Sequence, residues 1–257
     1  MTNKKSRNRP FNAKGPRGPQ PGSNEPVWLW GIHAVMAALA NPKRKILRVI
    51  ATPNAIKRGG LDMAEEMKPR DIDALLPSGA VHQGIAAQMR PLQSQSLEDM
   101  IAAAPRTVAV LDQVSDPHNL GAVLRSAAAF AVDSIVLQTR HSPAMTGIVA
   151  KSAAGAVEMV AETRVVNIAR ALEQLADAGY CTIGLAGEAD GSLAARIPAG
   201  DKLALVFGAE GAGLRPAVAK ACMWQARIEM APQMESLNIS NAAAIAFYQA
   251  HRSNAVT

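Results

Sequence analysis

The sequence predicts an α/β protein in which a parallel sheet with helices on both faces follows a smaller α/β unit. From residue 106 onward, strand-like apolar runs alternate with helix-like segments, which is the pattern of parallel βαβ units. Three of these runs end in turns rich in glycine, amide or hydroxyl groups, where open α/β sheets bind ligands. The 257 residues, 49% of them hydrophobic, can bury one substantial core or two modest ones.

The first part of the chain is predicted to hold a tail, a small unit and a linker. Residues 1–24 are rich in Pro, Gly and Asn, which predicts a disordered tail. Residues 25–90 form the small α/β unit, and residues 91–105 form a linker that runs into a short helix. Within the small unit, the pattern predicts these elements in order: a helix at 31–42, a strand at 46–52, a helix at 61–67 and a strand at 81–89.

Residues 106–257 are predicted to form the second domain. Its strands are expected at 107–114, 133–139, 159–166, 181–187, 202–208 and 224–231. Its helices are expected at 120–127, 147–158, 168–179, 215–222 and 239–252.

The formal charge of +6 is located in the tail. Residues 1–24 contain no acid, and outside them 21 basic residues balance 21 acidic ones. A basic segment without fixed structure binds phosphate backbones in a salt-dependent way, so the tail predicts contact with RNA. A purely solubilising tail is the alternative.

Metal sites, disulfides and membrane insertion are not predicted. Cys181 and Cys222 lie 41 positions apart without a CxxC motif or a histidine cluster, so we interpret them as interior residues in a reducing cytoplasm. No apolar stretch approaches the roughly 20 residues of a membrane span, and the basic N-terminus lacks the apolar core of a signal peptide.

The most informative segment is residues 111–127, LDQVSDPHNLGAVLRSA. An apolar strand ends in a polar turn with Asp116, His118 and Asn119 beside a proline, which is typical of a helix start. The following helix of small residues carries one arginine, Arg125, which is predicted to be buried. His118 is a candidate base, although packing in the turn explains its position equally well.

A second segment, VFGAEGAGLRP at residues 206–216, runs from an apolar strand into a glycine-rich turn with one carboxylate, Glu210. Glycines allow the backbone to approach a ligand closely, although a tight structural turn has the same composition. The G-x-x-G-x-G spacing is neither that of the Rossmann motif nor that of the P-loop. A nicotinamide cofactor or ATP is therefore not supported.

A third segment, at residues 227–244, places Ser236, Asn238, Ser240 and Asn241 before an alanine-rich helix. Capping accounts for one or two such residues at a helix start. Four polar residues within six positions therefore indicate a binding role as well.

The strings DPHNLGAVLRSA, FGAEGAGL and SLNISNAAAIAFY together resemble the three ordered motifs of the SpoU/TrmH RNA 2′-O-methyltransferases, which belong to the SPOUT class. The resemblance spans about residues 106–250. It implies a sheet with a deep trefoil knot near its C-terminus, which periodicity does not reveal because knots are almost absent from proteins. GIHAVMAAL and HQGIAA resemble the small, ribosomal-protein-like substrate-binding domain of ribosomal members, which favours a guanosine of 23S rRNA over tRNA as the substrate.

The resemblance implies transfer of the methyl group of S-adenosylmethionine to a ribose 2′-hydroxyl. It implies a homodimer whose active site borders the partner subunit, and no metal. The residues implied to act on the substrate are Arg125, Asn119, Glu210, Ser236 and Asn238. The residues implied to bind the cofactor are Gly208, Ile228, Leu237, Gly213 and Ser240.

The family's arginine, here Arg125, is implied to take the proton of the 2′-hydroxyl. A guanidinium with a pKa above about 12 seldom gives up its proton, so gripping a phosphate and stabilising the developing alkoxide is the physical alternative. Glu210 is expected to hold Arg125 or to brace the glycine loop. Asn119 and Asn238 are expected to orient the arginine and the ribose, and Ser236 to bond the substrate.

Two positions of the third motif depart from the family's pattern. Glu229 stands where proline is usual, and Pro232 stands where glycine is usual. Proline removes a backbone donor and fixes φ, so an altered loop and an altered cofactor affinity are expected here.

The sequence leaves two alternative interpretations of the function. One is a non-catalytic RNA-binding or ribosome-assembly protein with the same fold, which would take up no S-adenosylmethionine. The other, a nucleotide-dependent oxidoreductase, lacks the phosphate-binding fingerprint.

Overall fold

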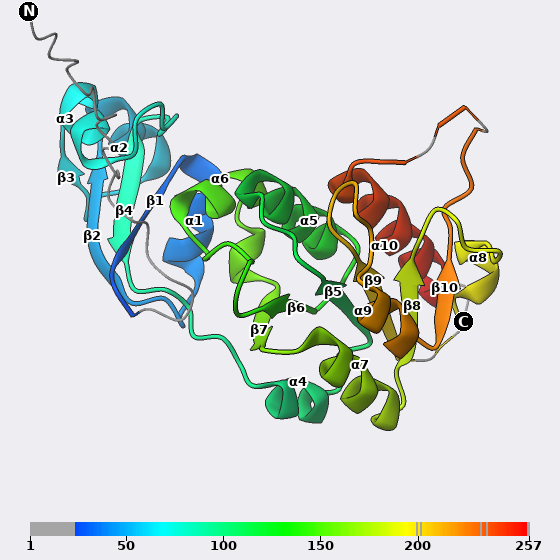
Figure 1. Cartoon of the computed structure of the whole chain (residues 1–257). Coiled ribbons are helices and arrows are strands. Elements are labelled where there is room, and N and C mark those ends of the chain that lie inside the picture. The colour runs from blue at the N-terminus through cyan, green and yellow to red at the C-terminus, as the bar shows by residue number, and fades with distance from the viewer. Residues whose placement is uncertain (1–23, 199, 201, 232, 235, 256–257) are drawn as a thin grey trace, which may run out of the picture.

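The computed structural model describes residues 24–198, 200, 202–231, 233–234 and 236–255. All but the last residue of the tail predicted at 1–24 lies outside these ranges. Figure 1 shows the small unit, in blue and cyan, beside a larger domain coloured green to red. None of the helices in the described ranges is long and apolar enough to cross a membrane.

The small domain is built on a four-stranded sheet with the order β1-β4-β2-β3. Strand β4 is antiparallel to β1 and β2, and β3 is parallel to β2. The elements in chain order are β1 (Val27–Trp30), α1 (Ile32–Ala40), β2 (Ile46–Ala51), α2 (Pro53–Gly59), β3 (Glu65–Glu66), α3 (Pro69–Leu75) and β4 (Ile85–Met89).

The helix predicted at residues 61–67 is wrong. The segment turns and then forms β3, in which Glu65 pairs with Ile50 of β2 and its carboxylate binds the Arg48 guanidinium at 2.8 Å. Strand pairing thus overrides the helix propensity of this stretch. Helices α2 and α3 flank it instead, and each begins with a proline in its first turn. Strand β1 was not predicted.

The larger domain contains a six-stranded, entirely parallel sheet with the order β10-β8-β9-β5-β6-β7, which confirms the predicted fold class. Its elements are α4 (Leu97–Ala103), β5 (Thr107–Leu111), α5 (Pro117–Ala129), β6 (Ser134–Gln138), α6 (Gly147–Ala153), η1 (Ala156–Glu158), β7 (Ala161–Val165), α7 (Ile168–Asp177), β8 (Cys181–Leu185), α8 (Leu193–Arg196), β9 (Leu203–Phe207), α9 (Pro216–Ala221), β10 (Trp224–Ala226) and α10 (Ile239–Ala255).

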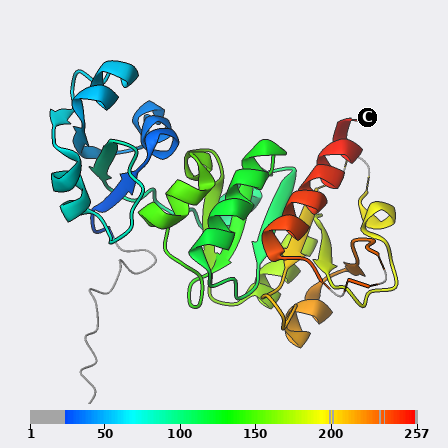
Figure 2. The same cartoon turned by 90° about the horizontal axis from the view of Figure 1, so that it is seen from above.

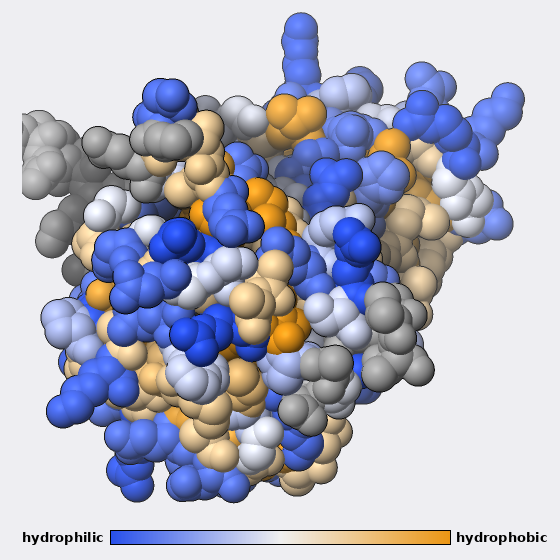
Figure 3. All heavy atoms as spheres, turned by 90° about the vertical axis from the view of Figure 1, so that its right-hand side faces the viewer, coloured by the Kyte–Doolittle hydropathy of each residue, from blue (hydrophilic) through white to orange (hydrophobic). Residues whose placement is uncertain are grey.

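Helices cover both faces of this sheet (Figures 1 and 2). Because strand residues alternate between faces, Ala109 and Leu111 of β5 pack in the core formed with α5, α6 and α10. Val108 and Val110 pack in the core formed with α4, α7 and α9. On the side that carries α8 and β10, hydrophilic residues predominate and apolar residues form small separate patches (Figure 3).

Helices α5 and α6 differ from their predicted bounds for reasons that the structure shows. Helix α5 begins at Pro117, because the Asp116 carboxylate caps it by accepting a hydrogen bond from the backbone N–H of His118 at 2.9 Å. The helix predicted at 147–158 is interrupted after Ala153, since Ala154 and Gly155 have φ values of 50° and 97°. At Gly155 a Cβ would crowd the side chain of Ala37 in α1, so this break lets α1 approach closely.

A buried ion pair joins the two domains. Arg44, which follows α1, binds Glu158 of η1 at 2.6 Å, and both side chains are at most 5% exposed. Asn41 Nδ2 donates a further hydrogen bond to Glu158 Oε2 at 2.8 Å, and Arg44 Nη1 donates one to the carbonyl of Arg90. The charges are thus compensated by partners from both sides of the contact.

Candidate active site

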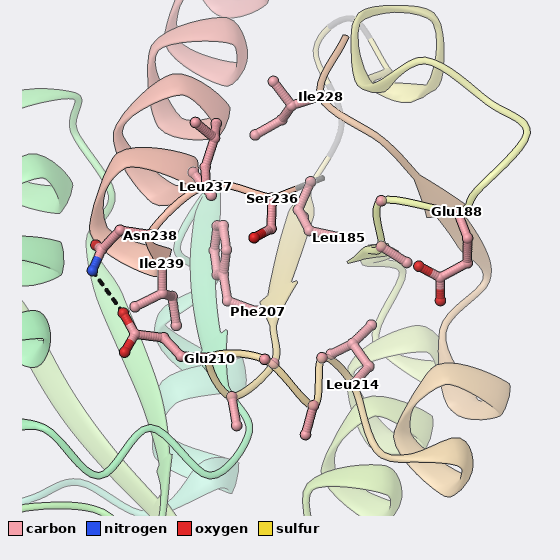
Figure 4. Close-up of a pocket in the computed structure, with 18 of the residues that line it drawn as sticks. Leu185, Glu188, Phe207, Glu210, Leu214, Ile228, Ser236, Leu237, Asn238 and Ile239 are labelled. Atoms are coloured by element: carbon pink, nitrogen blue, oxygen red, sulfur yellow. Dashed lines mark hydrogen bonds between the residues drawn. The ribbon is translucent and has the colours of Figure 1, made fainter. Parts of the chain in front are cut away.

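A pocket of about 1010 Å³ opens at the carboxyl ends of β8 and β9 (Figure 4). Its walls come from residues 185–188 after β8, residues 207–214 after β9, and described residues between 228 and 242, around the start of α10. The pocket therefore lies at the strand edge where the sequence predicted a ligand.

The glycine-rich turn forms one wall of the pocket. Ala209 and Gly213 exchange two backbone hydrogen bonds, at 3.0 and 2.9 Å, which close the turn on itself. A Cβ at Gly208 would overlap the backbone of Gly213 and Leu214, so only glycine fits there. Gly211 has a φ of 78°. The turn thus requires glycine for close backbone approach and for its left-handed conformation.

An ion pair beneath the turn fixes its position. Asp112, which is 1% exposed, accepts two hydrogen bonds from Arg215 Nε at 2.9 and 3.1 Å, and its own N–H donates to the Phe207 carbonyl. The hydrogen bond to Asp112 raises the pKa of Arg215. Burial, together with the nearby Asp112 charge, raises the pKa of the Cys222 thiol to about 12. Cys222 therefore stays a protonated, half-buried thiol.

Apolar side chains form the walls opposite one another. Ile228 and Leu237 lie in the upper part of the view in Figure 4, with Phe207 between them and Leu214. Flat apolar walls with a few polar groups suit an aromatic base, and the closely packed turn at Gly208 offers backbone groups beside it. These residues fit the adenosine part of S-adenosylmethionine.

Glu210 joins the first and third motifs. Its Oε1 accepts hydrogen bonds from Asn119 Nδ2 at 2.9 Å and from Asn238 Nδ2 at 2.6 Å. Asn238 Oδ1 accepts from the N–H and the hydroxyl of Ser240, at 2.8 and 2.6 Å, at the start of α10. Within one subunit, Glu210 thus binds two amides and makes no hydrogen bond or ion pair with Arg125 of the same chain.

Arg125 is exposed on α5, which corrects the expectation that it is buried. It makes no hydrogen bond or ion pair with the residues that the structure describes, and it does not line the pocket. His118, seven residues earlier, lies on the same exposed side of α5 as Arg125. Its Nδ1 is 3.2 Å from the Ser152 hydroxyl.

The structure brings most of the predicted residues to the pocket. Its lining includes the predicted residues Gly208, Gly213, Ile228, Leu237, Glu210, Ser236 and Asn238. Asn119 and Ser240 lie behind it, through their hydrogen bonds to Glu210 and Asn238. Glu229 is exposed, and Pro232 lies outside the described residues.

Sequence reasoning missed the segment after β8. Residues 185–188 line the pocket, with the Glu188 carboxylate on the side away from Glu210 in Figure 4. The sequence feature that could have indicated this segment is the pair of small residues, Ala186 and Gly187, at the carboxyl end of a predicted strand. In the described part of the chain, no group of three His, Cys, Asp or Glu side chains is arranged to hold a metal ion.

The fold and the site define an α/β protein with a cofactor pocket at the carboxyl edge of a parallel sheet. Two family models match the chain. The SpoU rRNA methylase family model matches residues 106–248, and the model of the RNA 2′-O ribose methyltransferase substrate-binding domain matches residues 28–95.

Curated relatives and solved structures agree with these matches. A protein of Vibrio vulnificus is 36% identical over 90% of this chain and 97% of its own length, and one of Escherichia coli K12 is 35% identical over 87% and 97%. Both are named 23S rRNA (guanosine-2′-O-)-methyltransferase RlmB. The SpoU methyltransferase AviRb of Streptomyces viridochromogenes, in complex with AdoMet, has a TM-score of 0.74 at 19% identity, over 90% of this chain and 92% of that one.

The chain belongs to the SpoU rRNA methylase family. It is an RNA ribose 2′-O-methyltransferase with S-adenosylmethionine as its methyl donor. The alternative interpretation, a non-catalytic RNA-binding or ribosome-assembly protein with the same fold, is therefore rejected.

Proposed function

We propose that this enzyme methylates the ribose 2′-hydroxyl of a guanosine in 23S rRNA, in the cytoplasm. The observation that carries the proposal is the similarity to enzymes named for this reaction, at about 35% identity over 96% or more of their length. The similarity includes the small domain matched by the substrate-binding model, and not only the pocket.

We infer the following division of roles. S-adenosylmethionine, when bound, supplies an electrophilic methyl group on its sulfonium. Gly208 and Gly213 offer backbone groups to it, and Ile228 and Leu237 flank its adenine. The Glu210 carboxylate holds the amides of Asn119 and Asn238 in place, and the exposed Ser236 hydroxyl faces the substrate side. Because the methyl donor and the ribose hydroxyl are both held in place, a bimolecular reaction becomes effectively unimolecular, which lowers its entropic cost.

The proposed role of Arg125 requires a second copy of the chain. Along α5, Arg125 and Ala129 are exposed, and along the adjacent α10, Ile245 and Tyr248 are 36% and 49% exposed. We propose a homodimer through this face, with Arg125 reaching the pocket of the partner subunit. There its fork of donors grips a phosphate and stabilises the developing alkoxide.

The three pocket segments also support the implied knot. The chain that leaves β10 is tied to the loop after β8, because Arg227 N–H donates to the Gly191 carbonyl at 2.8 Å and Leu193 N–H donates to the Arg227 carbonyl at 2.9 Å. It then returns through the described residues before α10 to the turn after β9. We propose that these crossings form the trefoil knot.

Replacing Glu210 by glutamine is expected to preserve the fold and to lower the methyl-transfer rate by about tenfold, because two hydrogen bonds to a charged acceptor become weaker neutral ones. Single-turnover rates at saturating cofactor, beside thermal unfolding of both proteins, measure the two effects separately. A loss of folding without a catalytic defect would mean that Glu210 only braces the glycine loop.

The substrate is tested by mapping 2′-O-methyl groups in the rRNA and tRNA of cells with and without the protein. We expect the loss of one guanosine mark in 23S rRNA. The mark should return when purified protein and S-adenosylmethionine are added to 23S rRNA from the deficient cells. A mark lost only from tRNA would overturn the proposed substrate.

A further inference from the structure

A line of polar side chains runs from the active site to the small domain. Asn119 binds Glu210. The residue directly before it, His118, has a ring nitrogen 3.2 Å from the Ser152 hydroxyl. The next residue before Ser152 in α6 is Lys151, and its Nζ donates a hydrogen bond to Gln83 Oε1 at 2.8 Å. In Figure 1, α6 lies between α5 and the small domain.

Lys151 is a cation without an anion. Its hydrogen-bond acceptor is a neutral amide, and no carboxylate in the described part of the chain forms an ion pair with it. Its side chain is half-buried, and the loss of water around it lowers the pKa of Lys151. A partly dehydrated ammonium is stabilised when an anion completes its surroundings.

Gln83 holds this ammonium in a fixed place. Its backbone has a φ of 56°, an unfavourable conformation for a residue other than glycine. Its Oε1 also accepts a hydrogen bond from the N–H of Ile32, at 3.2 Å. Backbone strain of this kind concentrates at functional sites, where the position of a side chain matters more than local stability.

We propose that Lys151 binds a phosphate of the substrate RNA where the strand passes from the small domain to the methyl-transfer site. The inference rests on the proposed function, because RNA is the polyanion that both domains must contact at once. Lys151 lies at their junction, one residue from a side chain that touches His118 of the first motif. His118 and Ser152 continue the polar surface from Lys151 toward Asn119.

The test compares three variants of the full chain in binding to 23S rRNA transcribed in vitro, over a range of KCl concentrations. Lys151→Met removes the charge and keeps the length of the side chain. Gln83→Ala removes the hydrogen bond between Gln83 and Lys151 and keeps the charge. Lys202→Met is the matched control. Among the described residues Lys202 also donates its hydrogen bond to a neutral oxygen, the Ala178 carbonyl, and it directly precedes β9, at the amino ends of the strands and opposite the carboxyl ends that carry the pocket.

For Lys151→Met we expect weaker RNA binding, and a plot of log Kd against log salt whose slope is smaller by about 0.7 to 0.9, the value for one lost phosphate contact. The affinity for S-adenosylmethionine should not change. Gln83→Ala and Lys202→Met should keep the slope of the unmodified protein.

Equal slopes for all four proteins would overturn the proposal, and so would equal losses for Lys151→Met and Gln83→Ala without a change of slope, since the contact would then serve domain docking alone. If the unmodified protein methylates tRNA and not 23S rRNA, the proposed substrate fails. The same comparison of slopes, carried out with tRNA, then decides the role of Lys151 separately.

Discussion

Arg125→Lys is expected to lower the rate of methyl transfer by about 10²- to 10³-fold, which is the usual effect of losing one donor that stabilises a developing oxyanion. Lysine keeps the positive charge but replaces a planar fork of five donors by a compact ammonium. Because the proposed contacts of Arg125 are with the RNA phosphate and the ribose oxygen and not with the cofactor, the affinity for S-adenosylmethionine should stay within about twofold, so the loss appears in the rate at saturating cofactor. Calorimetry and single-turnover kinetics measure the two quantities, and near-normal turnover would contradict the proposed role.

A mixing experiment tests whether Arg125 acts on the partner subunit. Arg125→Ala and Glu210→Ala are each expected to be inactive as pure proteins. If the two subunits of a symmetric dimer exchange freely, half of the dimers carry one variant of each kind, and one of their two sites is intact, so about a quarter of the normal activity returns. Activity that stays absent after mixing would place both residues in the same site.

Gly208→Ala is expected to weaken binding of S-adenosylmethionine by tenfold or more. The added methyl group overlaps the backbone of Gly213 and Leu214, which no change of rotamer relieves. Overpacking of this kind costs about 1–3 kcal/mol, and each 1.4 kcal/mol corresponds to a factor of about ten in affinity. Methyl transfer should be restored in part by high concentrations of the donor, in contrast to the Arg125→Lys variant.

Gly211→Ala is the contrasting change in the same turn. Its φ of 78° is unfavourable for alanine, at about 1–2 kcal/mol, but a Cβ there meets open space. A smaller loss of cofactor affinity than for Gly208→Ala is expected. Equal affinities for the Gly208→Ala protein and the unmodified one would show that the turn is not the cofactor's support.

The parallel sheet was predictable because its strands are apolar runs separated by amphipathic or small-residue helices, and both signals are local. Strand β1 was missed because four residues are too few to establish a period. The helix predicted at 61–67 failed because the pairing of β3 with β2 depends on residues far apart in the chain, such as Glu65 and Arg48. Local pattern does not contain that information.

The site was predictable in its composition and less so in its geometry. Seven of the ten predicted site residues line the pocket, but Glu188 stands in no motif, and only the order of the strands brings it there. The burial of Arg125 was wrong because alanines and other small residues occupy several sides of α5, so the sequence has no distinct apolar stripe to show which side faces outward. The hydrogen-bond donors to Glu210 were also not predictable, because they depend on where segments far apart in the chain meet.

The ion pair between Arg44 and Glu158 constrains which small domain can pack on this larger one, although the sequence pattern presents the two as separate units. In the full chain, replacing Arg44 by an apolar residue would leave the Glu158 carboxylate buried without its counter-charge, and removal of one partner of such a pair typically costs about 3–5 kcal/mol. Grafting the small domain of another family member onto this enzyme therefore requires that the graft supply an arginine and an amide at these two places. In chimeras, the unit to exchange is the domain together with the residues of η1 that receive it.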